Sequence, residues 1–310
     1  MIRYIFKRLL TMIPIMLGTA FIIFTIINLT PGDPAILILG PSAPLEAIEQ
    51  LRGEMGLNDP FFVRFFHYIY NIMTKLDFGK SYLSKKPVYD EIFKRLPISI
   101  NIATCGMVCA CLLGIPIGVI SAVRQYSAVD NISRITAMVL VAIPGFWLAM
   151  MLLLIFSLKL GWVPSSGISS WRNYILPCIT LGCVNGGSVL RITRSSMLET
   201  IRSDYVRMAQ AKGVPQSIVV LRHAFMNALL PVITTSGGIF GGLLGGAIVT
   251  ETIFSMPGLG TLIVQCIKLK DIPTVLASII LLAFCFGIIM LIVDLLYAFC
   301  DPRIKAKYSR

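Results

Sequence analysis

Few residue patterns in this chain could carry out chemistry. Residues Thr74–Ser81 read Thr-Lys-Leu-Asp-Phe-Gly-Lys-Ser and end like a phosphate-binding loop, but Thr74 stands where that motif has its first glycine. A phosphate cradle needs the backbone turn that this glycine allows, with a helix directly after it. His67 and His223 are the two histidines, and neither His-Glu-x-x-His nor Gly-x-Ser-x-Gly occurs. We therefore expect no nucleotide site, metal site or hydrolytic nucleophile, and no cofactor bound by this chain.

The eight cysteines form no redox or metal pattern. None lies in the long polar segment 30–97, where a disulfide would stabilise most, and Cys-x-x-Cys does not occur. Most of them fall inside apolar runs. We expect them to behave as small buried apolar residues.

Composition predicts a membrane protein. Hydrophobic residues make up 56% of the chain and charged residues only 14%, with a mean hydropathy of +0.83. Soluble proteins carry about a quarter charged residues, and a helix of roughly 20 apolar residues spans a bilayer. Six runs without Asp, Glu, Lys, Arg or His reach about this length: Leu9–Leu29, Ile98–Val123, Ile135–Leu158, Asn173–Leu190, Ala224–Thr250 and Ile272–Val293. The predicted fold is all-α, a polytopic membrane protein with six transmembrane helices.

The net charge of +12 is distributed according to orientation. With a cytoplasmic N-terminus, four segments lie inside: 1–8, 124–134, 191–223 and 299–310. These segments hold most of the excess of Lys and Arg over acids, whereas the outer segments are nearly balanced. This is the positive-inside pattern, and it places both termini in the cytoplasm. The basic excess therefore indicates topology and gives no support to nucleic-acid binding.

We expect one membrane domain with one extracytoplasmic insertion. Its parts are a tail and first span at 1–29, an outer loop at 30–97, a five-helix core at 98–298 that carries a cytoplasmic elbow at 191–223, and a cytoplasmic tail at 299–310. The first apolar run is longer than that of a signal peptide, and no small-x-small site follows it, so we expect it to remain as a helix.

The outer loop should contain helices near Pro44–Met55 and Pro60–Lys75. A loop of this length is usually functional or disordered. Its many aromatic residues favour a folded lip on the membrane, and an interfacial aromatic belt explains them equally well.

Polar residues inside the predicted spans are few, and such residues are usually paired or functional. Asp294 is expected to pair with a cytoplasmic-side Arg or Lys, with a proton relay as the alternative. Asn185, Ser188 and Thr235 could line a polar path. Interhelical hydrogen bonds explain each of these three equally well.

Glycines recur at four-residue spacing in several predicted spans. The run Gly237-Gly-Ile-Phe-Gly-Gly-Leu-Leu-Gly-Gly246 leaves one helix face without side chains, and Gly114/Gly118 and Gly182/Gly186 are further pairs. Small residues at this spacing let helix backbones approach closely in lipid. We expect close helix packing, and a sliding contact along a path is the alternative.

Residues 191–223 predict a helix–glycine–helix elbow. Ser196 and Glu199 have the spacing of a capping box, Gly213 suits the position after a helix, and Pro215 suits the first turn of the next. The residues that it would present are Tyr205, Arg207, Met208, Ala209, Lys212 and Gly213. It has too few apolar residues to anchor in lipid, so a protein partner is favoured over a merely polar surface helix.

The stretch Asp204-Tyr-Val-Arg-Met-Ala-Gln-Ala-Lys-Gly213 resembles the EAA loop of binding-protein-dependent ABC importer permeases, in the version of the dipeptide, oligopeptide, nickel and glutathione class. Nearly the whole chain continues the resemblance in the family's order, with Thr30-Pro-Gly-Asp-Pro34, Arg95-Leu-Pro97, Gly114-Ile-Pro-x-Gly118, Ile143-Pro-Gly-Phe-Trp147, Arg194-Ser-Ser-Met197, Asn227-Ala-Leu-Leu-Pro231, Glu251-Thr-Ile-Phe-Ser-x-Pro-Gly-Leu-Gly260 and Asp301-Pro-Arg303. The Pro-Gly-Asp-Pro start and the long outer loop resemble the first of two paired permeases. Arg207 and Met208 stand where the broad motif has Glu and Ala.

The resemblance implies a type I ABC importer permease fold in a bacterial or archaeal cytoplasmic (inner) membrane, surrounded by lipid. A second homologous permease would pair with this chain, two ATP-binding subunits would grip the elbows, and an extracytoplasmic substrate-binding protein would deliver the cargo. ATP and Mg²⁺ would bind the partner subunits, so this chain would be a permease subunit and no enzyme. Glu251, Pro257 and Gly258 of the late signature would belong to an outer gate.

An ion-coupled secondary transporter is the alternative function. It would need carboxylates or a broken-helix ion site at the membrane midplane, often in two inverted copies. The sequence has no internal repeat and only Asp294 as a carboxylate within a span, near its inner end. The cargo stays open among dipeptides, oligopeptides, glutathione and nickel chelates, because in this family selectivity resides largely in the binding protein.

Overall fold

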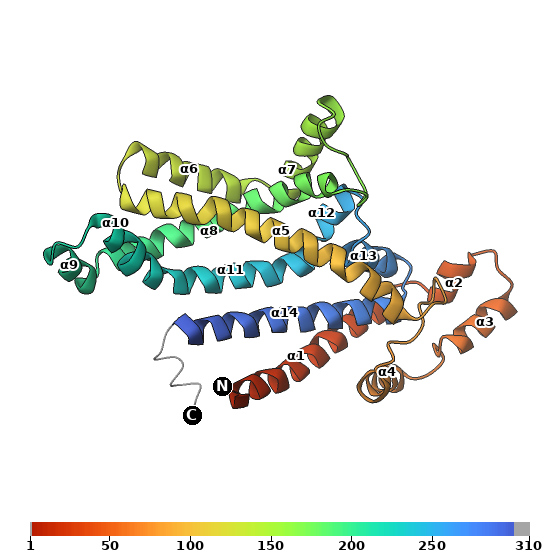
Figure 1. Ribbon diagram of the computed structural model, residues 1–310. Helices are drawn as coiled ribbons and strands as arrows, with labels where there is room; N and C mark the ends of the chain where they lie inside the picture. The colour runs from red at the N-terminus through yellow and green to blue at the C-terminus, as the bar shows by residue number, and fades with distance from the viewer. Residues whose placement is uncertain (1, 301–310) are drawn as a thin grey trace. The chain divides into compact units, whose positions relative to one another are not determined.

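The computed structural model describes residues 2–300, and helices dominate this range (Figure 1). Five helices are long and apolar enough to cross a membrane: α1 (Ile2–Leu29), α5 (Val88–Val123), α8 (Ile175–Ile201), α11 (Met226–Gly246) and α14 (Ile272–Cys300). A bent pair of helices makes a sixth span when the pair counts as one. The predicted all-α membrane fold is confirmed. The Asp301-Pro-Arg303 signature and most of the predicted tail lie outside the described residues.

The third predicted span is not one straight helix. α6 (Ala128–Ala142) is followed by a second helical segment, Gly145–Lys159, and the two are bent by 97°. Pro144 causes the break, because proline excludes the residue before it from the α region. Ile143 accordingly has φ −71 and ψ 125. The expectation of a continuous helix over Ile135–Leu158 is therefore wrong, since it rested on hydropathy alone.

Two other spans are longer than hydropathy predicts. α5 begins at Val88, inside the segment expected as outer loop, and α8 continues to Ile201. The additional turns carry charged residues, which end an apolar run without ending the backbone hydrogen bonding. In α5, Asp90 and Glu91 occupy the first turn, where negative charge is favourable at the N-terminal end of the helix dipole.

The chain divides into two compact bodies. We call residues 2–4, 100–256 and 288–300 the core body, and residues 5–99 and 257–287 the lip body. α1, α5 and α14 each contribute residues to both.

α8 is the central helix of the core body, because α6 and α11 both pack along it (Figure 1). α5 approaches it most closely at its glycines. A Cβ on Gly114 would lie 2.8 Å from the carbonyl oxygen of Gly186, and one on Gly118 would lie 2.9 Å from that of Leu190. Backbones this close leave no room for a side chain, so the predicted packing of these small residues is confirmed.

The two predicted helices of the outer loop are confirmed. They are α3 (Leu45–Glu54) and α4 (Phe61–Lys75), and a short helix α2 (Pro34–Leu39) precedes them. Asp33 caps α2 by accepting a hydrogen bond from the Ala35 amide at 2.8 Å, and its carboxylate also pairs with Arg52 of α3.

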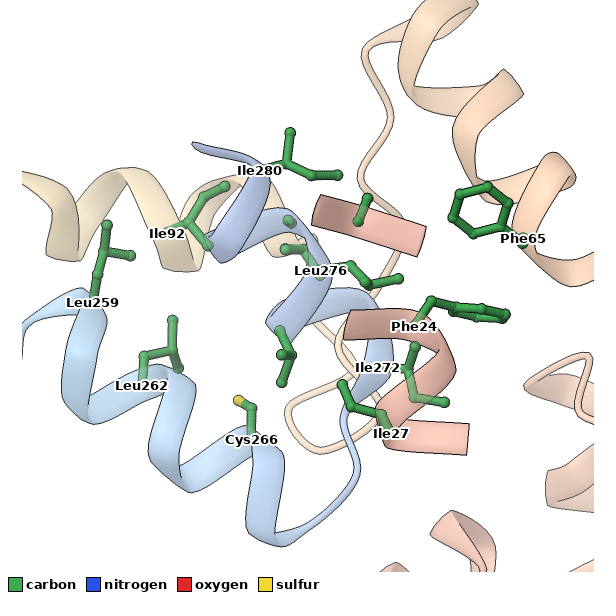
Figure 2. Packing of buried hydrophobic residues seen from close by; sticks show 14 residues of the cluster. Phe24, Ile27, Phe65, Ile92, Leu259, Leu262, Cys266, Ile272, Leu276 and Ile280 are labelled. Carbon is green, nitrogen blue, oxygen red and sulfur yellow. The ribbon is translucent and has the colours of Figure 1, made fainter. Parts of the chain in front are cut away.

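The lip body is built on an apolar cluster that joins α1, α4, α5, α14 and the helix α13 (Leu259–Lys268) (Figure 2). Phe24 of α1 packs against Phe61 and Phe65 of α4, with ring centroids 4.9 and 5.4 Å away. Figure 2 also shows Leu276 of α14 within this cluster. Phe61 and Phe65 therefore belong to a folded lip, whereas Phe62, Phe66 and Tyr70 are exposed, so the aromatic belt stays open for these three.

The buried carboxylate of Asp271 links the loop between α13 and α14 to Ser81 and Tyr82 of the lip body. Asp271 is fully buried and accepts hydrogen bonds from Ser81 Oγ at 2.5 Å, the Tyr82 amide at 3.0 Å and Thr274 Oγ1 at 2.9 Å. Burial, together with the charge of Asp271, raises the pKa of Tyr82 to about 12. Its hydroxyl thus stays protonated and donates to the carbonyl oxygen of Met55 at 3.3 Å. Ser81, at the end of the phosphate-loop-like segment, therefore has a structural role.

Candidate functional site

The predicted elbow is present. α9 (Asp204–Ala211) has Lys212 as its C-cap, and Gly213 follows with φ +75, a conformation that glycine adopts without strain. Pro215 directly precedes the short helix α10 (Gln216–Ile218), which continues as the π-helical segment η3 (Val219–Phe225) into α11. The helix–glycine–helix arrangement is confirmed.

The predicted capping box is wrong. Ser196 and Glu199 lie inside α8, which runs on to Ile201, and the Ser196 carbonyl oxygen accepts a hydrogen bond from Thr200 Oγ1 at 2.8 Å. Ser203 precedes α9 instead, in an extended conformation. The sequence spacing was right for a cap, but helix α8 continues because its buried face packs along its whole length.

A small apolar core holds the elbow together. Val206 and Ala209 of α9 are buried against Val219 of η3, with Val214 alongside. Ala209, which the sequence analysis placed among the presented residues, thus faces inward, because it lies three residues from Val206 on the same side of the helix. The other side of α9 is exposed and carries Tyr205, 48% accessible, and Met208, 60% accessible.

The remaining predicted elbow residues surround this exposed side. Arg207, Lys212 and Gly213 are all exposed. A surface helix that shows Tyr205 and Met208 between cationic side chains has the composition of a protein contact, since aromatic residues, Met and Arg are enriched there.

Beneath the elbow, a second cluster joins four elements of the core body. Met197 of α8 is fully buried with Ala122 of α5, Ala224 of η3 and Ala228 of α11. Because η3 also supports α9, packed side chains lead from the elbow into three long helices. Small alanines at three of the four positions allow close packing around the single Met.

An ion pair that the sequence analysis missed ties α8 to α6. Asp130, fully buried at the start of α6, accepts hydrogen bonds from Arg194 Nε at 2.7 Å and from its second nitrogen, Nη2, at 2.9 Å. Ser121 Oγ donates to the same carboxylate at 2.6 Å, and the Tyr126 amide donates at 3.0 Å. This bidentate contact fixes both the distance and the relative orientation of the two side chains. The signal in the sequence was Ser127-x-x-Asp130, whose spacing suits a helix start.

A cavity of about 490 Å³ lies between α8, α11, α7 (Gly145–Leu152) and α12 (Ile248–Ile253). Its lining is mostly apolar with three polar residues, Thr180, Asn185 and Thr250. Asn185 lines this cavity and its amide nitrogen donates to the Leu181 carbonyl at 2.8 Å, while its role in a polar path stays a prediction. Ser188 and Thr235 are half-buried but do not line this cavity, so their role stays a prediction.

The predicted gate residues fall in different bodies. Glu251 is fully buried in α12 of the core body, while Pro257 is exposed and Gly258 is buried at the start of α13 in the lip body. A buried carboxylate at a helix start is consistent with a structural or a gating role. The gate stays a prediction.

The glycine run of α11 has two different sides. A Cβ on Gly237 would lie 2.2 Å from Val293 of α14, so this glycine serves close packing. Gly238, Gly242 and Gly245 have no atom within 4 Å of such a Cβ among the described residues. Packing within the chain thus explains one side of the run only.

Asp294 accepts a hydrogen bond from the Tyr4 hydroxyl at 2.8 Å, a partner that the sequence analysis did not consider. The cysteines differ in exposure, from Cys266, which is buried, to Cys105, which is exposed. The expectation that all would be buried is wrong for Cys105. Residues 2–300 contain no cluster of three side chains able to hold a metal ion.

Comparison with known proteins decides the family. Residues 114–306 match the binding-protein-dependent transport system inner membrane component, and residues 1–103 match the N-terminal part of such a membrane component. The chain belongs to this family. It is a multi-pass inner-membrane permease of a binding-protein-dependent ABC importer, a system that includes an ATPase and a substrate-binding protein. The ion-coupled alternative is not favoured.

Relatives of known name cover the whole chain. A glutathione transport system permease protein of Salmonella choleraesuis (strain SC-B67) is 42% identical over 99% of this chain and 100% of its own length. The protein of the same name from Escherichia coli (strain K12) is 41% identical over the same shares.

Two solved structures share the fold. One is the MetNI methionine ABC transporter in an inward-facing conformation, with a TM-score of 0.54 and 18% identity over 66% of this chain and 93% of that chain. The other is an amino acid ABC transporter with histidines, with a TM-score of 0.51 and 14% identity over 69% of this chain and 94% of that chain. At these identities the likeness shows the permease fold alone.

Proposed function

We propose that this permease docks an ATPase subunit on its elbow and transmits the ATPase's movement to its membrane helices. The observation that carries this proposal is the construction of α9. Val206 and Ala209 fix it to η3, while Tyr205 and Met208 are exposed on a neighbouring side of the helix. The exposed residues Arg207, Lys212 and Gly213 complete the docking surface.

Movement of α9 can reach the path because the contacts are continuous. The elbow core packs on η3, and η3 shares the cluster around Met197 with α5, α8 and α11. Asp130 and Arg194 then join α8 to α6, which therefore moves with it. A densely packed set of helices transmits displacement because its interior cannot be compressed.

The proposed assembly places both termini and the elbow in the cytoplasm of a bacterial or archaeal cell. The chain is the first of two paired permeases, and two ATP-binding subunits bind ATP and Mg²⁺ below them. Basic residues gather in the elbow segment and the N-terminal tail, which supports this orientation. This chain then binds no nucleotide or metal of its own and catalyses no reaction.

The proposed cargo is glutathione or a closely related small peptide. This rests on the relatives at 41% and 42% identity, whose similarity covers the lip as well as the core. Asn185, Ser188 and Thr235 line the path, and Glu251, Pro257 and Gly258 belong to its outer gate. Thr250 beside Glu251 already lines the cavity that contains Asn185, which supports this arrangement.

Mild cross-linking of the tagged chain in its native membrane, followed by purification and mass spectrometry, tests the assembly. We expect a second permease, ATP-binding subunits and a soluble binding protein, and we expect the binding protein to take up glutathione in calorimetry. Recovery of the chain alone would contradict the assembly. A binding protein that binds neither glutathione nor small peptides would contradict the cargo.

A further inference from the structure

A second cavity in the core body, of about 380 Å³, lies between α6 and α8. One part of its lining is apolar, formed by Ala137, Met138, Val141, Ala142 and Leu190. The other part is formed by Arg134, Arg191 and Arg194, with Ser195 beside them. Cationic groups thus gather at one end of an otherwise apolar cavity, toward the elbow end of α8.

Two of these three arginines are electrostatically uncompensated. Arg194 is paired with Asp130, so this part of the cluster is neutral. Arg134 and Arg191 are exposed, and within residues 2–300 neither side chain makes a hydrogen bond or ion pair. The carboxylate of Asp130 already accepts hydrogen bonds from Arg194, Ser121 and Tyr126. It therefore does not neutralise a second arginine. The cavity therefore carries a net positive charge.

The position of Arg191 indicates what it faces. It lies in the first turn of α8 beyond the apolar run that ends at Leu190, so it stands at the elbow end of the span, where its side chain is exposed. Asn185, Ser188, Arg191 and Ser195 are three or four residues apart along α8, so they share one side of the helix. On this side of α8, Asn185 lines the cavity described above, and Arg191 and Ser195 line the second cavity between α6 and α8.

We propose that Arg134 and Arg191 form a cationic station that binds a carboxylate of the cargo at the elbow end of the path. This inference rests on the proposed function, which names a peptide cargo. Glutathione carries two carboxylates and one ammonium group at neutral pH, so its net charge is negative. A guanidinium offers two parallel N–H donors that match a carboxylate, and the apolar wall beside it accommodates the rest of the molecule. The phosphate of an anionic lipid has the same oxyanion chemistry, and the experiment must distinguish the two.

The test is ATP-driven uptake of labelled glutathione by the complete complex in proteoliposomes, with Arg191→Gln, Arg191→Lys and Arg134→Gln. Arg191→Gln removes a charge-assisted hydrogen bond, so we expect KM to rise about tenfold. Arg191→Lys keeps the charge without the fork and should fall between wild type and Gln. Arg124→Gln is the matched control, because Arg124 is an exposed arginine of the same body that does not line the cavity, and it should transport like the wild type.

Each variant is reconstituted in phosphatidylcholine alone and in phosphatidylcholine with phosphatidylglycerol. The station predicts the same KM increase for Arg191→Gln in both lipids. A deficit that appears only with phosphatidylglycerol would show that the arginines hold an anionic lipid headgroup and would overturn the proposal. Equal impairment by Lys and Gln, no impairment, or loss of binding-protein-stimulated ATP hydrolysis would also overturn it. Absence of uptake by the wild-type complex would instead contradict the proposed function.

Discussion

At the residue scale, the ion pair between Asp130 and Arg194 shows how the fold accommodates charged side chains in a membrane protein. Both side chains lie near the ends of apolar helices, where an isolated charge is costly. Their two-pronged contact satisfies the charges, and Ser121 and Tyr126 complete the hydrogen bonds of the carboxylate. The pair could not be predicted because its members are far apart in the chain, and hydropathy says nothing about which loop an acid approaches.

Removal of one partner of this pair should destabilise the permease. Asp130→Asn leaves the Arg194 charge without its partner, and a broken buried ion pair costs about 3–5 kcal/mol. Thermal unfolding of the purified chain in detergent measures the loss. The double variant Asp130→Asn with Arg194→Gln should lose less than the sum of the two single variants, since neither then leaves an unpaired charge. Additive losses would show that the two residues act independently.

The contact between Asp33 and Arg52 gives a pH dependence to the lip. Burial opposes ionisation of Asp33, but the hydrogen bonds from Arg52 and the Ala35 amide outweigh it, so its pKa lies below the usual 3.8. A lowered pKa contributes stability that is present above pH 3.8 and is lost as the pH falls through the folded-state value. The melting temperature of the wild type should therefore be higher than that of Asp33→Asn at pH 6, and this difference should shrink at about pH 3. A difference that is equal at both pH values would contradict this assignment.

At the element scale, the sequence predicted the helix–glycine–helix elbow but not which side of α9 is buried. Gly213 and Pro215 mark the turn between two helices, and both act as their conformational preferences require. Which side of α9 is buried depends on Val219, a residue of another element. The sequence therefore could not show that Ala209 supports the elbow while Tyr205 and Met208 face outward.

Met208→Glu should uncouple the transporter. Met208 is 60% exposed on the proposed docking side, so a carboxylate there leaves the fold intact but must be desolvated when the ATPase docks. We expect binding-protein-stimulated ATP hydrolysis and uptake to fall at least about tenfold, the effect of about 1.4 kcal/mol lost at an interface hot spot. Gln210→Glu is the matched control, because it adds the same charge at an exposed position of α9 away from Tyr205 and Met208. Equal losses in the two variants, or none in Met208→Glu, would argue against this docking side.

The glycines of α5 and α11 should respond differently to alanine. A Cβ on Gly114 would lie 2.8 Å from a backbone oxygen, so Gly114→Ala forces α5 and α8 apart and should cost about 1–3 kcal/mol. Gly238 has open space at the same position, and Gly238→Ala should be neutral or stabilise the isolated chain by up to about 1 kcal/mol through helix propensity. Thermal unfolding in detergent compares them. A Gly114→Ala variant as stable as wild type would contradict the close approach of these helices.

At the scale of the whole molecule, the number of spans could be predicted because the thickness of the hydrocarbon fixes the length of an apolar run. The bend of 97° at Pro144 could not be predicted from hydropathy, because hydropathy reports only that Ile135–Leu158 is apolar. The charged turns at the ends of α5 and α8 could not be predicted either, because hydropathy does not show that the backbone stays helical beyond an apolar run. The order of short motifs indicated the family, and the match over residues 1–103 and 114–306 confirms it.

The central claim is that this permease moves glutathione by energy that ATP-binding partners deliver through the elbow. Uptake of labelled glutathione into proteoliposomes that contain the complete complex tests it most directly. The account predicts accumulation that requires ATP and the binding protein, is unaffected when proton and sodium gradients are collapsed, and falls at least about tenfold with Met208→Glu. Accumulation that continues without ATP and follows an ion gradient would contradict it.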